Sequence, residues 1–407
     1  MNNSSAEKQP VIVLAFSGGL DTSYCVVYLR QQGYRVHAVT VNTGGFTPEQ
    51  LTEMEQRAHQ LGAEKFVVLD ETKRFYKKCL RYLVYGNVLR NHTYPLSVSA
   101  ERVFQALAIV QYAQDNKAEY VAHGSTGAGN DQVRFDLAFR ILSPKVKIIT
   151  PIRDQQLSRQ QEVEFLKENG IDWSWEKAKY SINQGIWGTS VGGQETLTSD
   201  QHLPEEAYPS QLVDRGSQKV TLGFEKGEVE TLNGKSFKHP IELIQELQKM
   251  AAVYAIGRDT HVGDTIVGIK GRVGFEAAAP LIIIHAHQLL EKHNLTKWQL
   301  YWKDQLATWY GMMVHEGQFL DPVMRNIETF LKDTQKLVSG EVYIQLHPYR
   351  FELQGISSTH DLMSSEFGDY GEANKAWTGE DVKGFTNIAA NATKIWFAVN
   401  RKKRDKS

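Results

Sequence analysis

The sequence has 407 residues, of which 46 are Lys or Arg and 47 are Asp or Glu, so its formal net charge is −1. This balance argues against a dedicated nucleic-acid binder, whose phosphate contacts require a basic excess. Cys25 and Cys79 are too few for a disulfide framework, and both lie in apolar helical patterns that predict core positions. The longest apolar run, residues 277–284, is far shorter than the ~20 residues that cross a bilayer. We therefore expect a soluble, cytoplasmic protein with neither a membrane nor a nucleic acid as partner.

The first 170 residues alternate short apolar runs with amphipathic stretches. Apolar runs bounded by Gly or polar residues predict buried strands at 11–16, 35–41, 65–69, 119–122 and 146–150. The periodic stretches between them predict helices at 22–32, 48–60, 72–85 and 99–115. This alternation favours an α/β fold with a doubly wound parallel sheet, whose ligands bind beyond the carboxyl ends of the strands. Residues 1–170 are therefore predicted to form a first domain.

The regular alternation of strand and helix patterns stops after the first domain, which predicts a second, α+β domain over residues 171–363. Residues 181–217 are rich in Gly, Ser, Thr and Gln, and we expect a long ordered loop or lid there. Asn233-Gly234 predicts a type I′ hairpin between strands 229–232 and 236 onward. Further expected elements are a strand at 220–224, helices at 240–256, 278–292 and 298–333, and a hairpin at 341–346 and 350–355.

Residues 364–407 are predicted to be a C-terminal arm with a last helix near 387–399. Trp396 and Phe397 lie on this helix, and we expect them to be exposed and to dock on another subunit. The basic end, Arg401 to Arg404, is expected to be a solvated tail.

The strongest motif is Phe16-Ser17-Gly18-Gly19-Leu20-Asp21-Thr22-Ser23, between the first predicted strand and helix. Gly18 and Gly19 allow a tight turn that brings backbone N–H groups close to a ligand. Hydroxyl side chains and the positive end of the helix dipole add to this anion site. The motif lacks the Lys of a P-loop and the glycine spacing of a dinucleotide fingerprint. We expect a pyrophosphate cradle in a nucleotide-binding domain; the alternative is a capped Gly-rich turn.

A second polar segment, His123 to Asp136, follows the fourth predicted strand. Its glycines predict a pliable backbone, and a helix is expected to begin near Asn130. On that helix Asn130 and Arg134 share a face, while Asp131 is displaced by about 100°. The face thus offers an amide and a guanidinium for carboxylate or ureido groups, beside a carboxylate for an ammonium. The alternative is a capped helix with exposed charges.

Both segments resemble motifs of known enzymes. SGGLDTS is similar to the PP-loop of ATP pyrophosphatases, and residues 124–136 closely resemble the signature G-[AC]-T-G-K-G-N-D-Q-V-R-F-E of the argininosuccinate synthase family. Similarities in family order cover nearly all of residues 10–400. They include Tyr94 to Ser99, Pro151 to Arg153, Tyr180 to Ile182, Trp187 to Ser190, Gly257-Arg258 and Gly384 to Ile388.

The resemblance implies an adenine nucleotide α-hydrolase-like first domain, a synthetase domain and an arm that helps to build a homotetramer. It implies that ATP, with Mg²⁺, adenylates the ureido oxygen of citrulline, and that the amine of aspartate then displaces AMP, in arginine biosynthesis. The positions that match ATP-binding residues are Ala15, Phe16, Ser17, Gly18, Gly19, Leu20, Asp21, Thr22, Ser23, Val41 and Gly124. Aspartate-binding positions are Thr126, Asn130 and Asp131, and Asp131 is implied to position the amine. Citrulline-binding positions are Tyr94, Ser99, Asn130, Arg134, Ser181 and Ser190.

Some positions depart from the family pattern. Phe16 replaces a Tyr and Ala128 replaces a Lys, while Gly263 and Phe275 stand where the family has a citrulline-binding Glu and Tyr. The Glu would suit the α-ammonium of citrulline. Its loss predicts either that Asp264 takes over or that the acceptor is an N-acylated citrulline without that ammonium. Because the first loop has no Lys, we expect Mg²⁺ and backbone N–H donors to neutralise the negative charge of the phosphates.

Weaker patterns favour structural roles. His285 and His287 would point apart on a helix and could share a metal only on a strand. His315-Glu316 lacks the second His of a zinc-protease motif. Five aromatic residues spaced like a core stripe predict packing within the chain or between subunits; they are Trp298, Tyr301, Trp302, Trp309 and Tyr310.

Two other functions compete. Another PP-loop ligase is disfavoured, because a tRNA-thiolating enzyme needs a sulfur-carrying Cys pair and a basic surface, and a glutamine-dependent synthetase needs an amidotransferase nucleophile. A non-catalytic nucleotide-binding homologue stays open because of Ala128 and Gly263.

Overall fold

The computed structural model describes residues 9–127, 129–174, 180–364 and 376–404, except for the side chains of residues 402–404. Ala128, one of the departures from the family signature, lies outside the described residues. The chain separates into two compact units, residues 1–360 and 361–407. The finer division of the first unit at residue 170 stays a prediction.

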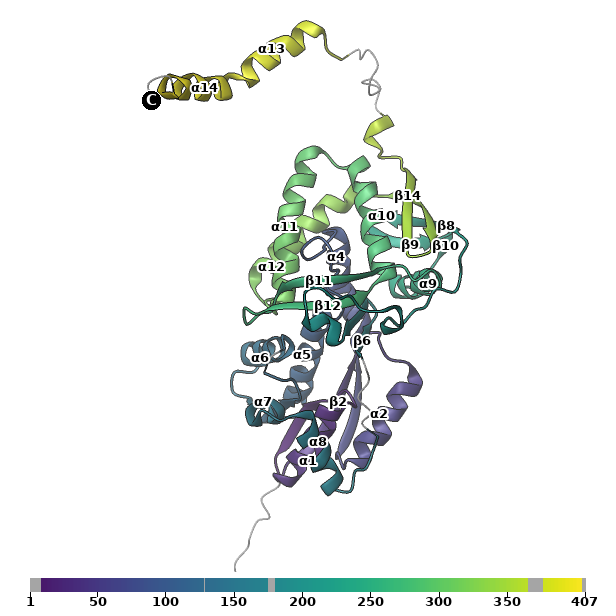
Figure 1. Cartoon of the computed structure of the whole chain (residues 1–407), viewed down its shortest axis with the longest axis vertical. Coiled ribbons are helices and arrows are strands. Elements are labelled where there is room, and N and C mark those ends of the chain that lie inside the picture. Colours follow the sequence, from purple (N-terminus) through teal and green to yellow (C-terminus); the bar gives the residue numbers. More distant parts are fainter. Residues whose placement is uncertain (1–8, 128, 175–179, 365–375, 405–407) are drawn as a thin grey trace, which may run out of the picture. The chain divides into compact units, whose positions relative to one another are not determined.

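A five-stranded parallel sheet occupies the N-terminal part, in the order β3-β2-β1-β4-β5. Its strand β2 is labelled in Figure 1. Its strands are β1 (Val11–Ala15), β2 (Arg35–Asn42), β3 (Lys65–Asp70), β4 (Tyr120–His123) and β5 (Lys147–Ile149). The residues of the central strand, Ile12, Val13 and Leu14, have no exposed surface, as expected of an apolar run covered on both faces. The predicted doubly wound α/β sheet is confirmed.

Helices pack on both faces of this sheet. Residues of α1 and α8 share one hydrophobic core with it, and residues of α5 and α6 share another. The helices of this part are α1 (Leu20–Gln31), α2 (Pro48–Gln60), α5 (Ser97–Asp115), α6 (Asp131–Leu142), α7 (Pro151–Gln155) and α8 (Arg159–Glu168). The predicted helix 72–85 consists of α3 (Thr72–Phe75), a π-helical turn (Tyr76–Leu80) and α4 (Arg81–Tyr85). Cys25 and Cys79 are buried, as predicted.

A second sheet is antiparallel, in the order β10-β9-β8-β13-β14. Its strands are β8 (Gln218–Glu225), β9 (Glu228–Leu232), β10 (Lys235–Ser236), β13 (Gly340–His347) and β14 (Arg350–Ser357). Asn233 and Gly234 have φ of 51° and 75°, which confirms the predicted I′ turn.

A third sheet, in the order β11-β12-β7-β6, was not predicted from the sequence. Its strands are β6 (Ser181–Gly185), β7 (Gly188–Gly192), β11 (Arg258–Asp264) and β12 (Lys270–Glu276). The prediction of a loop throughout 181–217 is therefore wrong at its start. These strands are rich in Gly and polar residues because one face lines a cavity, so they lack the apolar alternation that identifies a strand.

The helices of this part are α9 (Pro240–Ala252), α10 (Ala278–Asn294), α11 (Lys297–His315) and α12 (Pro322–Thr334). The single helix predicted over 298–333 is wrong. Pro322 cannot continue a helix, and the Asp321 side chain caps α12 by accepting a hydrogen bond from the Val323 N–H.

The aromatic series on α11 does not pack inside the chain, contrary to the first of the two predicted alternatives. Tyr310 is fully buried, but four of the rings are more than half exposed, namely Trp298, Tyr301, Trp302 and Trp309. His285 and His287 lie on a helix, α10, so they do not face one ion. His287 is buried and bonded to Asn87 and Gln335, which is a packing role.

The second unit contains α13 (Gly379–Ala389) and α14 (Asn391–Arg404), so the helix predicted over 387–399 is interrupted at Ala390. Trp396 and Phe397 are 60% and 46% exposed, as expected, and their docking on another subunit stays a prediction. None of the described helices is both long enough and apolar enough to span a bilayer.

Candidate functional site

The strand order puts the two polar motifs side by side. The chain runs from β1 outward to β2 and β3, then returns to place β4 on the other side of β1. The register pairs Ala15 with His123, so the loops that follow β1 and β4 begin next to each other at the carboxyl edge of the sheet. Such a switch in strand order opens the crevice in which parallel sheets bind ligands.

The first loop forms the expected turn. Gly18 has φ of +74°, a left-handed conformation, and Gly19 is the extended residue that precedes α1. A Cβ at Gly18 would lie 3.1 Å from Met54 Cγ, so the position also lacks space for a side chain. The Ser17 N–H donates weakly to Thr22 Oγ1 at 3.4 Å, which closes the turn over the start of α1. The loop is therefore a built turn at a helix N-terminus, suited to an anion.

An acidic pair at this loop was missed by the sequence analysis. Asp21, in the first turn of α1, is hydrogen-bonded to Glu162 of α8, and Arg159 lies close to both. Burial raises the pKa of Asp21, and burial together with the charge of Asp21 raises the pKa of Glu162 to about 8. The two carboxyl groups therefore share a proton at neutral pH. Arg159 also lines the cavity described below and is a cation that the motif did not reveal.

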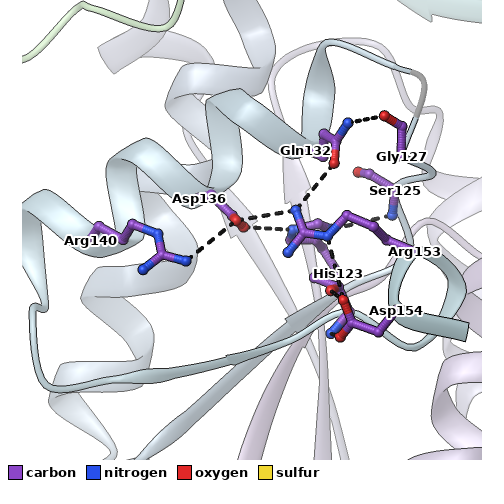
Figure 2. Close-up of polar contacts among 9 residues, drawn as sticks. His123, Ser125, Gly127, Gln132, Asp136, Arg140, Arg153 and Asp154 are labelled. Carbon is purple, nitrogen blue, oxygen red and sulfur yellow. Dashed lines mark hydrogen bonds and ion pairs between the residues drawn. The ribbon is translucent and has the colours of Figure 1, made fainter. Parts of the chain in front are cut away.

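The second loop is held by a polar network, shown in Figure 2. His123 Nδ1 accepts a hydrogen bond from the Ser125 N–H at 3.2 Å, so Nε2 carries the proton that is donated to Asp136 at 3.0 Å. Arg153 donates to the same Asp136 carboxylate at 3.1 Å and to Gln132 at 3.2 Å. These contacts fix the loop between β4 and α6 against α7, so that its backbone faces the first loop.

One cavity of about 1140 Å³ lies against both loops and the third sheet. Most residues singled out from the sequence line it: Ala15, Phe16, Ser17, Gly19, Leu20, Asp21, Thr22, Val41, Tyr94, Ser99, Gly124, Thr126, Asn130, Asp131, Arg134, Ser181 and Ser190. Gly18 and Ser23 do not line it, and the Ser23 hydroxyl is buried. Positions spread over about 175 residues of sequence therefore converge on one space.

The start of α6 makes contacts that the sequence did not reveal. Asn130 Oδ1 accepts a hydrogen bond from the Ile266 N–H at 2.8 Å, which ties the helix to the β11–β12 loop. Asp131 is not separated from Arg134: it accepts from Arg134 Nη1 at 2.8 Å and from Arg102 Nε at 2.9 Å. Burial would raise the pKa of Asp131, but the two arginines outweigh it and hold the pKa below the ordinary value. Asp131 is thus a carboxylate between two cations.

Glu101, also missed, is a nearly fully buried acid in the cavity wall. Its Oε2 accepts a hydrogen bond from the Thr43 hydroxyl at 3.1 Å, and Oε1 has no partner among the described residues. Burial raises the pKa of Glu101 to about 8, against the charge of Arg102. A Cβ at Gly185 would overlap Glu101, so the glycine of β6 makes room for this acid. A single sequence gives no signal that these two positions meet.

Another wall of the cavity, apart from the first loop, consists of β11, β12 and the residues they cover. Gly263 lines the cavity, whereas Phe275 is fully buried behind it and packs on Tyr94 with ring centroids 5.3 Å apart. Asp264 also lines the cavity, but it is 61% exposed and paired with Lys270 at 2.6 Å. It is thus a solvent-facing ion pair, and its suggested role as a replacement for the absent Glu stays untested.

The described residues contain no group of three or more His, Cys, Asp or Glu side chains that could hold a metal ion alone. This fits Mg²⁺ carried on a nucleotide, which uses one or two carboxylates and completes its coordination with phosphates and water. Asp21 is the carboxylate in the cavity wall nearest in sequence to the first loop. The site therefore fits a metal that enters with its substrate.

Comparisons with known proteins agree with these motifs. The arginosuccinate synthase N-terminal HUP domain matches residues 11–172, and the arginosuccinate synthase C-terminal domain matches residues 180–396. Curated argininosuccinate synthases from Dictyoglomus thermophilum and Methanocaldococcus jannaschii are each 35% identical, over 94% and 89% of this chain and 96% and 92% of their own. The protein of that name from Xanthomonas campestris is 34% identical over 96% of this chain and 99% of its own.

Proposed function

We propose, since this chain belongs to the argininosuccinate synthase family, that it uses ATP to join citrulline and aspartate, with release of AMP and pyrophosphate. The observation that carries the proposal is the single cavity in which the first loop, the start of α6 and the third sheet meet. Such a space supports a reaction in which two small amino acids react beside a nucleotide.

In this proposal the first loop binds the ATP phosphates with backbone N–H groups and the N-terminus of α1. Val41 and Gly124 border the nucleoside, and Arg159, close to Asp21, adds a cation beside the first loop. Asp21 would be the residue of the first loop that holds Mg²⁺, and the metal would supply positive charge at the phosphates. Because Asp21 and Glu162 share a proton, the pair adds less negative charge to the phosphate site than two free carboxylates would.

The chemistry has two steps. The ureido oxygen of the acceptor attacks the α-phosphorus of ATP and pyrophosphate leaves, which turns a poor leaving group into AMP. The amine of aspartate then attacks the ureido carbon, a C–N bond forms and AMP departs with the oxygen. Arg134, Tyr94, Ser99, Ser181 and Ser190 are proposed to hold the acceptor so that its ureido group faces the phosphates.

Thr126, Asn130 and Asp131 are proposed to hold aspartate. Because the pKa of Asp131 is lowered, its carboxylate is a weak base and suits orientation of the amine rather than proton removal. Its two arginine partners fix its direction, so the amine nitrogen meets a pre-positioned acceptor atom.

The test is a pyrophosphate-release assay with ATP, aspartate and a panel of ureido acceptors. Release that requires both ATP and an acceptor supports the ligase. If no acceptor supports release while ATP still binds, the alternative of a non-catalytic nucleotide-binding homologue is correct.

We also propose a cytoplasmic homotetramer with residues 1–170, 171–363 and 364–407 as its nucleotide-binding domain, synthetase domain and arm. Exposed apolar side chains on α13 and α14 support an arm that docks, above all Phe385, Ile388, Ile395 and Trp396. Light scattering of the full chain and of a chain that ends at residue 363 tests this: a tetramer that persists without the arm contradicts its role.

A further inference from the structure

The acceptor end of the cavity holds buried nitrogen atoms without hydrogen-bond partners in the described part of the chain. They are Arg134 Nη2, His261 Nδ1 and His315 Nδ1, and all three side chains line the cavity and are more than nine-tenths buried. Arg90 does not line the cavity, but its charge acts on both histidines and its Nε is also buried without a partner among the described residues. Because an unpaired buried nitrogen is unfavourable, the three that line the cavity indicate a ligand that supplies hydrogen-bond partners.

This end of the cavity is short of negative charge. Burial and then Arg90 lower the pKa of His261 to about 4, and burial and then Arg134 lower that of His315 to about 2. Both imidazoles are therefore neutral at pH 7, and a bound cation would be unfavourable beside the arginines.

The carboxylates nearby do not cancel the arginine charges. Asp131 is shared between Arg134 and Arg102, and Asp264 is paired with Lys270 in solvent. At this end the cavity is lined by the arginines Arg102, Arg134 and Arg272 and by the carboxylates Asp131 and Asp264, while burial raises the pKa of Glu101 to about 8 and keeps that acid protonated at pH 7. An anionic ligand fits this balance.

The wall also has room for a substituent. Gly263 and Gly271 face each other across β11 and β12, and both line the cavity. A Cβ at Gly263 would lie 2.7 Å from His261 Nε2, so the imidazole occupies that side of the wall. A Cβ at Gly271 would meet no described atom closer than 3.7 Å, so the space beside this glycine is open.

From this cluster we propose that the acceptor is an N-acylated citrulline whose acyl group ends in a carboxylate, as a succinyl group does. The inference rests on the proposed function, because it takes the ligand to be a citrulline derivative. The α-carboxylate common to all citrulline forms uses only part of the cluster, and a free α-ammonium would add positive charge beside Arg134, whose partner Asp131 is already shared with Arg102. Acylation removes that ammonium, and the acyl carboxylate supplies acceptors for the unpaired nitrogens.

The acyl group leaves the reaction unchanged. The ureido oxygen forms its bond to the α-phosphorus as pyrophosphate leaves, and the aspartate amine forms the C–N bond as AMP leaves. The amide nitrogen of the acyl group takes no part, so the product is an N-acylated argininosuccinate.

The experiment compares L-citrulline, N-acetyl-L-citrulline and N-succinyl-L-citrulline in the pyrophosphate-release assay. We expect kcat/KM to rise in that order, with the succinyl form at least about 10-fold above free citrulline, as one charge-assisted hydrogen bond allows. Free citrulline equal to or better than the succinyl form overturns the proposal, as does equality of the acetyl and succinyl forms, because the carboxylate is then not recognised. If no acceptor reacts, the proposed function fails. The affinities of the three compounds are then measured by calorimetry, and the proposal requires that affinity rise in the same order, from citrulline to the acetyl to the succinyl form.

A single variant tests whether the charge of Arg90 contributes to binding of the acyl carboxylate, apart from any effect on folding. Arg90→Gln should raise KM for the succinyl form about 10-fold and leave KM for the acetyl form within about 2-fold. Lys270→Gln is the matched control, because it removes a nearby positive charge that Asp264 already neutralises in solvent. The proposal is overturned if Arg90→Gln and Lys270→Gln change KM equally, or if Arg90→Gln changes KM equally for the acetyl and succinyl forms.

A second pair of variants tests the space. Gly263→Glu alone collides with His261, so it is combined with His261→Ala, and His261→Ala alone serves as the reference. The double variant should shift preference toward free citrulline by about 10-fold relative to that reference. An unchanged preference in a variant with native circular dichroism contradicts the proposal.

Discussion

The two ends of the cavity are built differently. At the nucleotide end, the chemistry comes from backbone groups of a contiguous loop, Phe16 to Ser23, and from the helix that follows. At the acceptor end, it comes from side chains on α5, α6, β11 and the end of α11, which meet only in the fold. A backbone site depends on local geometry and tolerates many side chains. A side-chain site can change its substrate through single substitutions, as the glycines at 263 and 271 suggest.

The largest effect should come from Asp131→Asn at the side-chain end. We expect formation of the ligated product to fall about 100-fold or more, because the amide no longer balances Arg102 and Arg134 or orients the amine. Acceptor-dependent adenylation in a single turnover should change only a few-fold. Rapid-quench measurement of both steps checks this, and an equal loss in both steps contradicts the positioning role.

Gly18→Ala tests the backbone end. The substitution strains a left-handed residue and presses on Met54, so kcat/KM for ATP should fall about 10-fold or more while KM for the acceptor stays unchanged. Gly33→Ala is the control: its φ of +86° imposes similar strain, but no atom lies within 4 Å and it is far from the loop in sequence. If both variants lose ATP turnover equally, the loss is caused by backbone strain and not by a change in the phosphate-binding loop.

Glu101→Gln tests the buried acid. In the folded protein Glu101 keeps its proton up to about pH 8, whereas in the unfolded chain it loses the proton near the ordinary value of 4.5. The folded state thus binds more protons between these pH values, and this group makes stability fall as pH rises through the window. Relative to the natural protein, the free energy of unfolding of the variant should therefore rise by about 1–3 kcal/mol between pH 5 and pH 8. Urea unfolding at four pH values checks this; a constant difference contradicts it.

Asp264→Asn should have the smallest effect. Because Asp264 is exposed and paired with Lys270, KM for free citrulline should change by less than about 2-fold. A 10-fold increase would instead identify Asp264 as the partner of the α-ammonium and would contradict an anion-binding acceptor end.

Sequence patterns predicted the parallel sheet well because its strands are buried on both faces and read as apolar runs. They missed β11 and β12 because those strands carry glycine and polar residues toward a cavity. On α11 the stripe spacing predicted packing within the chain or between subunits, and the exposure of Trp298 and Trp302 contradicts only the first alternative for those rings. Periodicity reports which residues share a face, but it does not report what covers that face.

The sequence by itself determined the first loop, proposed to bind the nucleotide: the eight residues Phe16 to Ser23 contain the turn, the start of α1 and the backbone donors. It also indicated the family and the two positions, Gly263 and Phe275, at which the chain departs from it. Only the tertiary structure decided that Arg90, Arg134, His261 and His315 gather at one wall, and that Asp131 is held by Arg102. The physical reason is that those contacts join segments up to 225 positions apart, so no local pattern records them.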